Sequence, residues 1–141
     1  MKTANESAKI LVVDDDPDAR GFLSVYLKKK KYLIEEAEDG EKALEKIDIF
    51  NPDVILLDIM MPKLTGDQLV KMIKLRMPNI KVIMITALSD QEIKAECIKN
   101  GAFAYLDKPV NLKNLFSTIN KALDRSLDSK EWGSNFIEEK Y

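Results

Sequence analysis

Carboxylate, hydroxyl and ammonium side chains follow four hydrophobic runs of this chain, at the point where each run ends. They are Asp14 and Asp15 after residues 9–13, Asp58 after 54–57, Thr86 after 82–85, and Lys108 after 105–107. If the runs are parallel strands of one sheet, their carboxyl ends share an edge, and open α/β sheets bind their ligands at that edge. Three carboxylates, a hydroxyl and an ammonium group would then meet in one pocket.

The three carboxylates predict a metal site. A cluster of like charges is costly unless a positive charge neutralises it, and a hard divalent cation with oxygen ligands is the natural candidate. Mg²⁺ prefers octahedral oxygen coordination and keeps several waters, so we expect Asp15 and Asp58 to be direct ligands and Asp14 to act through a water. The backbone carbonyl of Met60 is expected to complete the set.

The same cluster predicts a phosphoryl acceptor. A carboxylate is a weak nucleophile and repels an anionic phosphodonor, so Mg²⁺ is needed to bridge the carboxylates and the phosphoryl oxygens. Lys108 is expected to pair with the acidic cluster at rest and with a phosphoryl oxygen afterwards, while Thr86 donates its hydroxyl to another oxygen. Each residue alone has an ordinary explanation, since Asp, for example, favours turns and helix caps. The conjunction of all of them at four strand ends is what indicates this chemistry.

Short hydrophobic runs alternate with longer segments of helical period, which predicts βαβ units and a parallel sheet of the α/β class. The expected strands are 9–14, 32–36, 53–58, 81–86 and 103–107, and the expected helices are 17–30, 40–50, 66–76, 90–100 and 111–127. Several helix signals support these bounds. They are the cap and proline of Asp16-Pro17, the capping box of Ser89 and Glu92, the cap Asn111, and the glycine stop of Lys99-Asn100-Gly101.

Length, charge and composition narrow the function classes. The chain has 141 residues, a net charge of −2 and no histidine. This charge offers no general attraction to nucleic acid or anionic lipid, and no stretch approaches the roughly 20 apolar residues of a membrane span. We therefore expect a cytoplasmic protein with no nucleic-acid or membrane partner, divided into an N-terminal extension 1–8, one folded domain 9–127 and a C-terminal tail 128–141. The lack of histidine excludes histidine metal sites and phosphohistidine carriers.

Three further features have ordinary structural explanations. Cys97 is the only cysteine, which excludes an intrachain disulfide, and its spacing places it on the inner face of a helix. The run Lys28–Lys31 invites a nucleic-acid interpretation, but lysines at a helix carboxyl end more often complement the helix dipole. The tail carries Trp132, Phe136 and Ile137, which could dock on a partner or on the domain, although mobile termini are commoner.

Taken together, these residues resemble the receiver domain of two-component response regulators over about residues 9–124. The resemblance implies that Asp14 and Asp15 are the acidic pair, Asp58 the phosphoacceptor, Thr86 the switch hydroxyl, Tyr105 the switch aromatic and Lys108 the family's lysine. It also implies a doubly wound, flavodoxin-like sheet of five parallel strands in the order 2-1-3-4-5, and a cis peptide at Lys108-Pro109. Met61-Pro62 and Gly66 match the loop that follows the acceptor in that family.

By this resemblance the chain is expected to be a stand-alone signalling switch. A sensor histidine kinase or a phosphotransfer protein would phosphorylate Asp58, and the phosphorylated state would alter binding of a downstream protein through the face at residues 90–124. The chain would be a monomer or a phosphorylation-dependent dimer. It would catalyse only its own phosphorylation and dephosphorylation. The family controls water access at the positions of Met60 and Leu88, which are apolar here, so a long-lived phosphoryl group is expected.

Other α/β proteins match the sequence less well. Neither the dinucleotide motif Gly-x-Gly-x-x-Gly nor the nucleotide motif Gly-x-x-x-x-Gly-Lys-Ser/Thr is present. Asp14-Asp15-Asp16 would repel the phosphate of a flavodoxin-like mononucleotide. A phosphatase of the haloacid dehalogenase type has a second Asp two residues after its nucleophile, where this chain has Met60. The alternative from another class is a constitutive interaction module with a vestigial site, and the intact acidic and lysine positions count against it.

Overall fold

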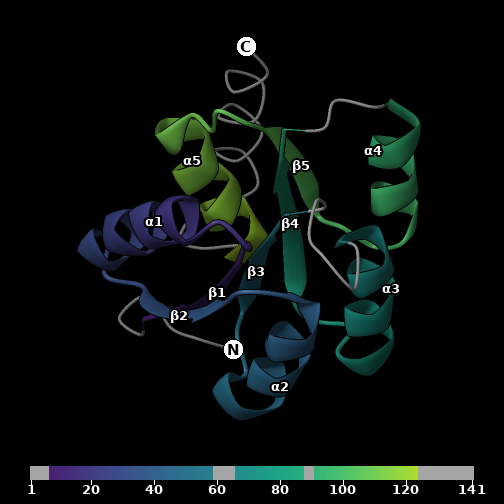
Figure 1. Ribbon diagram of the computed structural model, residues 1–141, viewed down its shortest axis with the longest axis horizontal. Coiled ribbons are helices and arrows are strands. Elements are labelled where there is room, and N and C mark those ends of the chain that lie inside the picture. The colour runs from purple at the N-terminus through teal and green to yellow at the C-terminus, as the bar shows by residue number, and fades with distance from the viewer. Residues whose placement is uncertain (1–6, 59–65, 88–90, 124–141) are drawn as a thin grey trace.

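The computed structural model describes residues 7–58, 66–87 and 91–123 of the chain. Strands and helices alternate along these residues (Figure 1). The strands are β1 Lys9–Val13, β2 Leu33–Ala37, β3 Val54–Leu57, β4 Lys81–Thr86 and β5 Ala104–Asp107. The helices are α1 Pro17–Lys29, α2 Gly40–Phe50, α3 Gly66–Arg76, α4 Gln91–Lys99 and α5 Leu112–Leu123. No helix among the described residues has the length and apolar character needed to cross a membrane.

The predicted elements are therefore confirmed, with small shifts at their ends. The last helix was expected to reach residue 127, and residues 124–127 lie outside the described part of the chain. The division into an extension 1–8, a domain 9–127 and a tail 128–141 stays a prediction, because the structure does not describe 1–6 and 124–141. The aromatic residues of the tail fall in the same range.

The strands form one parallel sheet in the order β2-β1-β3-β4-β5, which confirms the expected topology. Every crossover is made by a helix, so the carboxyl ends of the strands all reach the same edge of the sheet. The order of the strands reverses between β1 and β3, which is the point where open sheets of this class bind ligands. The fold thus brings the residues after β1 and β3 side by side.

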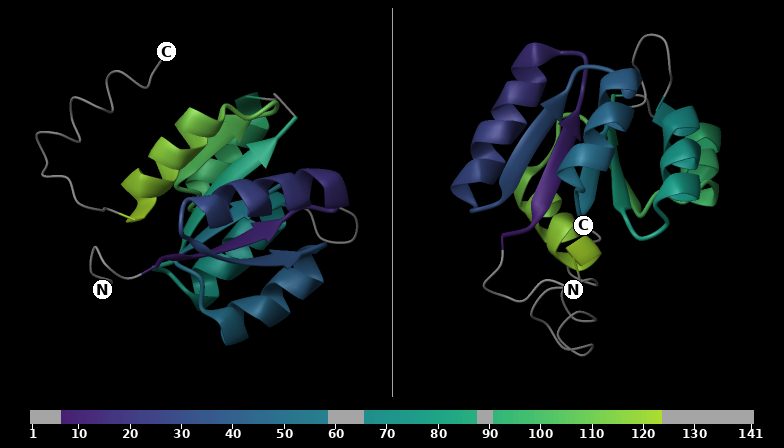
Figure 2. Two further views of the ribbon diagram at one scale, coloured as in Figure 1. Left: turned by 90° about the vertical axis from the view of Figure 1, so that its left-hand side faces the viewer. Right: turned by 90° about the horizontal axis from the view of Figure 1, so that it is seen from below.

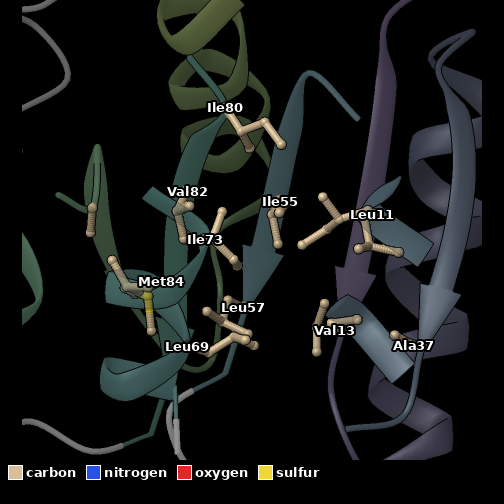
Figure 3. Packing of buried hydrophobic residues seen from close by; sticks show 14 of the residues in the cluster. Leu11, Val13, Ala37, Ile55, Leu57, Leu69, Ile73, Ile80, Val82 and Met84 are labelled. Carbon is tan, nitrogen blue, oxygen red and sulfur yellow. The ribbon is translucent and has the colours of Figure 1, made fainter. Parts of the chain in front are cut away.

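Helices cover both faces of the sheet, with α1 and α5 on one face and α2, α3 and α4 on the other (Figure 2). Alternate residues of each strand point to opposite faces, which is why the central strands are apolar at nearly every position. In β1, for example, Leu11 and Val13 face α2 and α3, whereas Ile10 and Val12 face α1 and α5. Figure 3 shows the first of these two cores, with Leu69 and Ile73 of α3, among others, packed over the sheet.

Polar side chains and a glycine set the helix ends as expected. The Asp16 carboxylate accepts a hydrogen bond of 3.0 Å from the Asp18 amide, and Pro17 occupies the first turn of α1. Asn111 caps α5 in the same way by accepting from the Asn114 amide at 3.0 Å. Gly101 has a φ of +114°, which suits glycine at a helix stop. The capping box predicted at Ser89 falls outside the described residues.

Cys97 and the first lysines of the run Lys28–Lys31 lie where their structural explanations placed them. Cys97 is fully buried in the core beneath α4, and burial raises the pKa of its thiol to about 11. Lys28 and Lys29 lie in the last turn of α1, where positive charge complements the helix dipole. Lys30 follows them, and its ammonium group lies 4.9 Å from the centre of the Phe116 ring of α5. Lys30 therefore links the end of α1 to α5.

Candidate functional site

Strand register places Asp14 beside Asp58. Val13 at the end of β1 is paired with Leu57 at the end of β3, so each Asp is the next residue on one of two adjacent parallel strands. The Asp58 amide donates to the Val13 carbonyl at 3.2 Å, and the Asp14 amide donates to the Ala37 carbonyl of β2 at 3.2 Å. Both residues thus continue the sheet with their backbones, and their side chains leave it at the same edge.

Lys108 joins the two carboxylates. Its ammonium nitrogen lies 3.1 Å from Asp14 Oδ2 and 2.9 Å from Asp58 Oδ2. The Lys108 amide donates to the Thr86 carbonyl at 2.9 Å, and the following peptide bond to Pro109 is cis, as the family resemblance implied. The hydrogen bond to Thr86 holds the Lys108 backbone at the end of the sheet, and the lysine side chain reaches back across the sheet edge to both carboxylates.

The two carboxylates of these ion pairs are largely shielded from water. Asp14 and Asp58 are only 4% and 7% exposed, and the Lys108 side chain is 28% exposed. Burial by itself would lower the pKa of Lys108, but the hydrogen bonds and negative charges of Asp58 and Asp14 outweigh it and raise the pKa. The lysine therefore remains a cation and partly neutralises the acidic cluster.

The acidic cluster has the donor set of a hard-cation site. Asp14, Asp15 and Asp58 each offer one carboxylate oxygen, and these oxygens lie within 4.8 Å of one another. Two ligands of one octahedral Mg²⁺ at about 2.1 Å are separated by up to about 4.2 Å, so only small side-chain adjustments would be needed to share an ion. Asp15 is exposed, whereas the other two are buried, which leaves the site open on one side. These residues fit a divalent cation.

Thr86 and Tyr105 lie on the same face of the sheet. Met84 of β4 is paired with Tyr105 of β5, and Thr86 is two residues beyond Met84, so all three side chains point toward α3 and α4. Thr86 is fully buried at the end of β4, while Tyr105 is partly buried beneath Lys94 of α4, whose ammonium nitrogen lies 5.0 Å from the ring centre. The two residues predicted to act as a switch are therefore near neighbours.

Two predicted site residues lie outside the described part of the chain. Met60, expected to supply a backbone carbonyl to the cation, falls in the segment 59–65, and Leu88, expected to control water access, falls in 88–90. The structure thus brings together Asp14, Asp15, Asp58 and Lys108. Thr86 adjoins this group, since its backbone carbonyl accepts the hydrogen bond from the Lys108 amide. The roles of Met60 and Leu88 stay predictions.

Sequence reasoning missed Arg20. Its side chain extends from α1 and donates to the Asp14 carbonyl at 2.6 Å, and the same guanidinium group pairs with Glu36 of β2. The only hint in the sequence is that Arg20 lies one helical turn after the cap Asp16, which places it near the acidic loop. Spacing alone does not show which way such a side chain points.

Comparison with known sequences gives a consistent result. The family model of the response regulator receiver domain matches residues 10–120. A cyclic di-GMP phosphodiesterase of Thermotoga maritima is 40% identical over 114 residues, which are 81% of this chain and 30% of that protein. The transcriptional regulatory protein ResD of Bacillus subtilis is 33% identical over 135 residues, or 96% of this chain and 55% of that protein. The chain thus spans about a third to a half of these two relatives.

Solved structures agree with the sequence comparison. A CheY-like response regulator receiver domain protein from Methanospirillum hungatei matches with a TM-score of 0.81 and 31% identity, covering 84% of this chain and 95% of that one. The chemotaxis protein CheY4 of Vibrio cholerae matches with a TM-score of 0.75 and 35% identity, covering 86% of this chain and all of that one. Each of these two matches covers more than four fifths of this chain.

Proposed function

The chain belongs to the response regulator receiver domain family, and on that premise we propose that it is a switch operated by phosphorylation of Asp58. The observation that supports this most strongly is the arrangement of charges at the sheet edge. Lys108 bridges Asp58 and Asp14, and Asp15 lies close enough to share a cation with both. A buried carboxylate beside a fixed ammonium group and an open cation site is what a phosphoryl acceptor needs.

Each residue has a defined part in the proposed transfer. A carboxylate oxygen of Asp58 attacks phosphorus, the new O–P bond forms, and the bond from phosphorus to the donor's imidazole nitrogen breaks with its electron pair left on nitrogen. Asp15 and Asp58, with Asp14 through a water and the Met60 carbonyl, would hold Mg²⁺, which when bound offsets the negative charge of the carboxylates and the phosphoryl oxygens. Lys108 exchanges its contact with Asp58 for one with a phosphoryl oxygen.

We propose that the new charge is transmitted through Thr86 and Tyr105. A hydroxyl recruited by a phosphoryl oxygen gains a charge-assisted hydrogen bond of about 1.5–3 kcal/mol, which is enough to shift a two-state loop. Movement of Thr86 toward Asp58 would open space on the shared face, which the neighbouring Tyr105 ring would fill. Inward movement of the ring would also carry it away from Lys94 of α4, so the change would reach the face at residues 90–124.

Thr86→Ala is therefore expected to separate phosphorylation from its consequences. The variant should still accept the phosphoryl group, but the chemical-shift changes that phosphorylation causes at residues 91–107 should be markedly smaller than in the wild-type protein. A matched control is Thr118→Ala, which removes a hydroxyl that donates only to the Asn114 carbonyl within α5. Shift changes of wild-type size in Thr86→Ala would refute the switch while leaving the acceptor site intact.

A long-lived phosphoryl group is also expected. The side chains of Met60 and Leu88 are apolar and have no group that can orient or deprotonate an attacking water. A double variant with Met60→Asn and Leu88→Glu should lose its phosphoryl group several-fold faster than the wild-type protein, as measured by intact-protein mass over time. If the double variant and the wild-type protein decay at the same rate, the apolar pair does not limit the access of water.

The proposed partners are a sensor histidine kinase or phosphotransfer protein as donor and a downstream protein as target. The exchange is proposed to occur in the cytoplasm, with the chain acting only on itself. The sharpest test is affinity capture with beryllofluoride-treated and untreated protein, with Asp58→Asn treated in parallel as the control. Capture of a partner by the treated wild-type protein alone supports the switch. Equal capture by all three samples would instead indicate a constitutive interaction module.

A further inference from the structure

Arg20 and Glu36 form a brace beside the acidic cluster. Arg20 projects from α1 toward the end of β2, two elements that lie side by side (Figure 2). Its Nη1 donates to the Asp14 carbonyl oxygen at 2.6 Å, and its Nε donates to Glu36 Oε1 at 2.9 Å. The Arg20 side chain is only 17% exposed. One guanidinium group therefore ties the loop after β1 to the neighbouring strand.

This contact acts on the peptide bond between Asp14 and Asp15. Because a peptide unit is planar, a hydrogen bond that fixes the carbonyl oxygen also fixes the direction in which the next residue leaves. The Asp14 carboxylate has its own supports, since Oδ1 accepts from the Asp16 amide at 3.0 Å and Oδ2 contacts Lys108. Asp15 is exposed, so the orientation of its backbone decides whether its carboxylate converges on the other two.

Glu36 both orients the Arg20 guanidinium group and offsets its charge. A guanidinium group is a rigid planar fork, so holding its Nε edge on Glu36 fixes where its Nη1 points. A lone guanidinium beside the cluster would also repel a divalent cation, and the Glu36 carboxylate offsets that charge at 2.9 Å. Burial opposes ionisation of Glu36, but the nearby Ser24 hydroxyl and the Arg20 guanidinium outweigh it and lower the pKa of the carboxyl. The Ser24 oxygen is itself buried without hydrogen-bonding geometry to any described group, so the contact with Arg20 is the firmer cause.

We infer that Arg20, held by Glu36, is a positioning residue that orients the Asp14–Asp15 peptide so that the two carboxylates converge on the cation required for phosphorylation of Asp58. The inference rests on the proposed function and adds to it a residue that contacts neither the cation nor the phosphoryl group. Removal of a group that orients metal ligands in this way typically lowers metal affinity by about 10- to 100-fold.

The test compares Arg20→Met with Arg76→Met. Arg76 also joins two elements through a carboxylate, since it leaves α3 and pairs with Asp48 of α2, and neither residue belongs to the acidic loop at residues 14–16. Mg²⁺ is titrated into each protein, and the dissociation constant is taken from the amide shifts of residues 14, 15 and 58. Arg20→Met should bind Mg²⁺ about tenfold more weakly than the wild-type protein, and Arg76→Met should bind as the wild-type protein does.

Phosphorylation rates supply a second readout that a general loss of structure would not reproduce. With phosphoramidate as donor, Arg20→Met should be slow at low Mg²⁺ and recover most of the wild-type rate at saturating Mg²⁺. Arg20→Lys should lie between the two, because a lysine can reach the carbonyl but lacks the fork that also holds Glu36. Glu36→Gln, which keeps the size of the side chain, should also weaken Mg²⁺ binding.

The outcomes separate the inference from the function on which it rests. If the wild-type protein and Arg20→Met bind Mg²⁺ equally, the brace does not position the carboxylates. A rate defect of Arg20→Met that persists at saturating Mg²⁺ would likewise overturn the inference, because the residue would then act on another step. If the wild-type protein neither binds Mg²⁺ nor becomes phosphorylated, the proposed function itself fails. Should Arg20→Met not fold, the same comparison is decided with Glu36→Gln.

Discussion

Asp58→Asn should accept no phosphoryl group from acetyl phosphate or phosphoramidate, while the wild-type protein gains the mass of one. The amide has nearly the size of the carboxylate and can still accept a hydrogen bond from Lys108, which contacts Asp58 Oδ2 at 2.9 Å, so the fold should be kept. What is lost is the anionic oxygen that attacks phosphorus. Intact-protein mass spectrometry in the presence of Mg²⁺ measures the result, and chelation of Mg²⁺ should abolish labelling of the wild-type protein.

The matched control for this variant lies at the other end of the same strand. Asp53 directly precedes β3 and Asp58 directly follows it, and the Asp53 carboxylate accepts from the Lys9 amide at 2.8 Å at the opposite edge of the sheet. Asp53→Asn should therefore be labelled as the wild-type protein is. Equal labelling of Asp58→Asn and Asp53→Asn would show that Asp58 is not the acceptor.

Lys108→Met should destabilise the protein strongly when Mg²⁺ is absent. The substitution leaves Asp14 and Asp58 as two buried carboxylates without their shared cation. Removing one partner of a buried ion pair costs about 3–5 kcal/mol, and partial exposure of the lysine reduces this to about 2–3 kcal/mol of unfolding free energy. Because the ammonium group no longer competes for the carboxylates, added Mg²⁺ should stabilise this variant more than it stabilises the wild-type protein.

Urea unfolding with and without Mg²⁺ measures both effects of this substitution. Lys113→Met is the matched control, since Lys113 is an exposed lysine in the first turn of α5 and its loss should change stability by less than about 0.5 kcal/mol. Wild-type stability of Lys108→Met in the absence of Mg²⁺ would contradict the structural account of the charge cluster. So would an equal stabilising effect of Mg²⁺ on the variant and on the wild-type protein.

The residues of the central cluster could be predicted because each follows a strongly patterned strand. Continuous apolar runs such as Val54–Leu57 define buried parallel strands, and parallel strands end at one edge, so Asp14, Asp58 and Lys108 could be placed at that edge. Opposite charge then predicted that Lys108 pairs with the acidic cluster. Strand order did not follow from the pattern, and it was expected only from the resemblance to the receiver family.

Arg20 could not be predicted because its contact is made to a backbone oxygen. Every residue carries such an acceptor, so the sequence does not show which carbonyl a given arginine meets. Its partner Glu36 lies on the edge strand β2, where acidic residues are common on an open edge and give no signal of their own. Contacts of this kind depend on the angle between α1 and β2, which only the folded structure fixes.

Chemical trapping tests most directly whether the carboxylate of Asp58 carries the phosphoryl group. Reduction of an acyl phosphate with borohydride converts the aspartate into homoserine, which remains in place during digestion and sequencing by mass spectrometry. After treatment with phosphoramidate and Mg²⁺, we expect homoserine at position 58 and at no other aspartate position, including Asp14 and Asp15. Homoserine at a different position, or none at position 58 in protein that has gained the phosphoryl mass, would contradict this assignment.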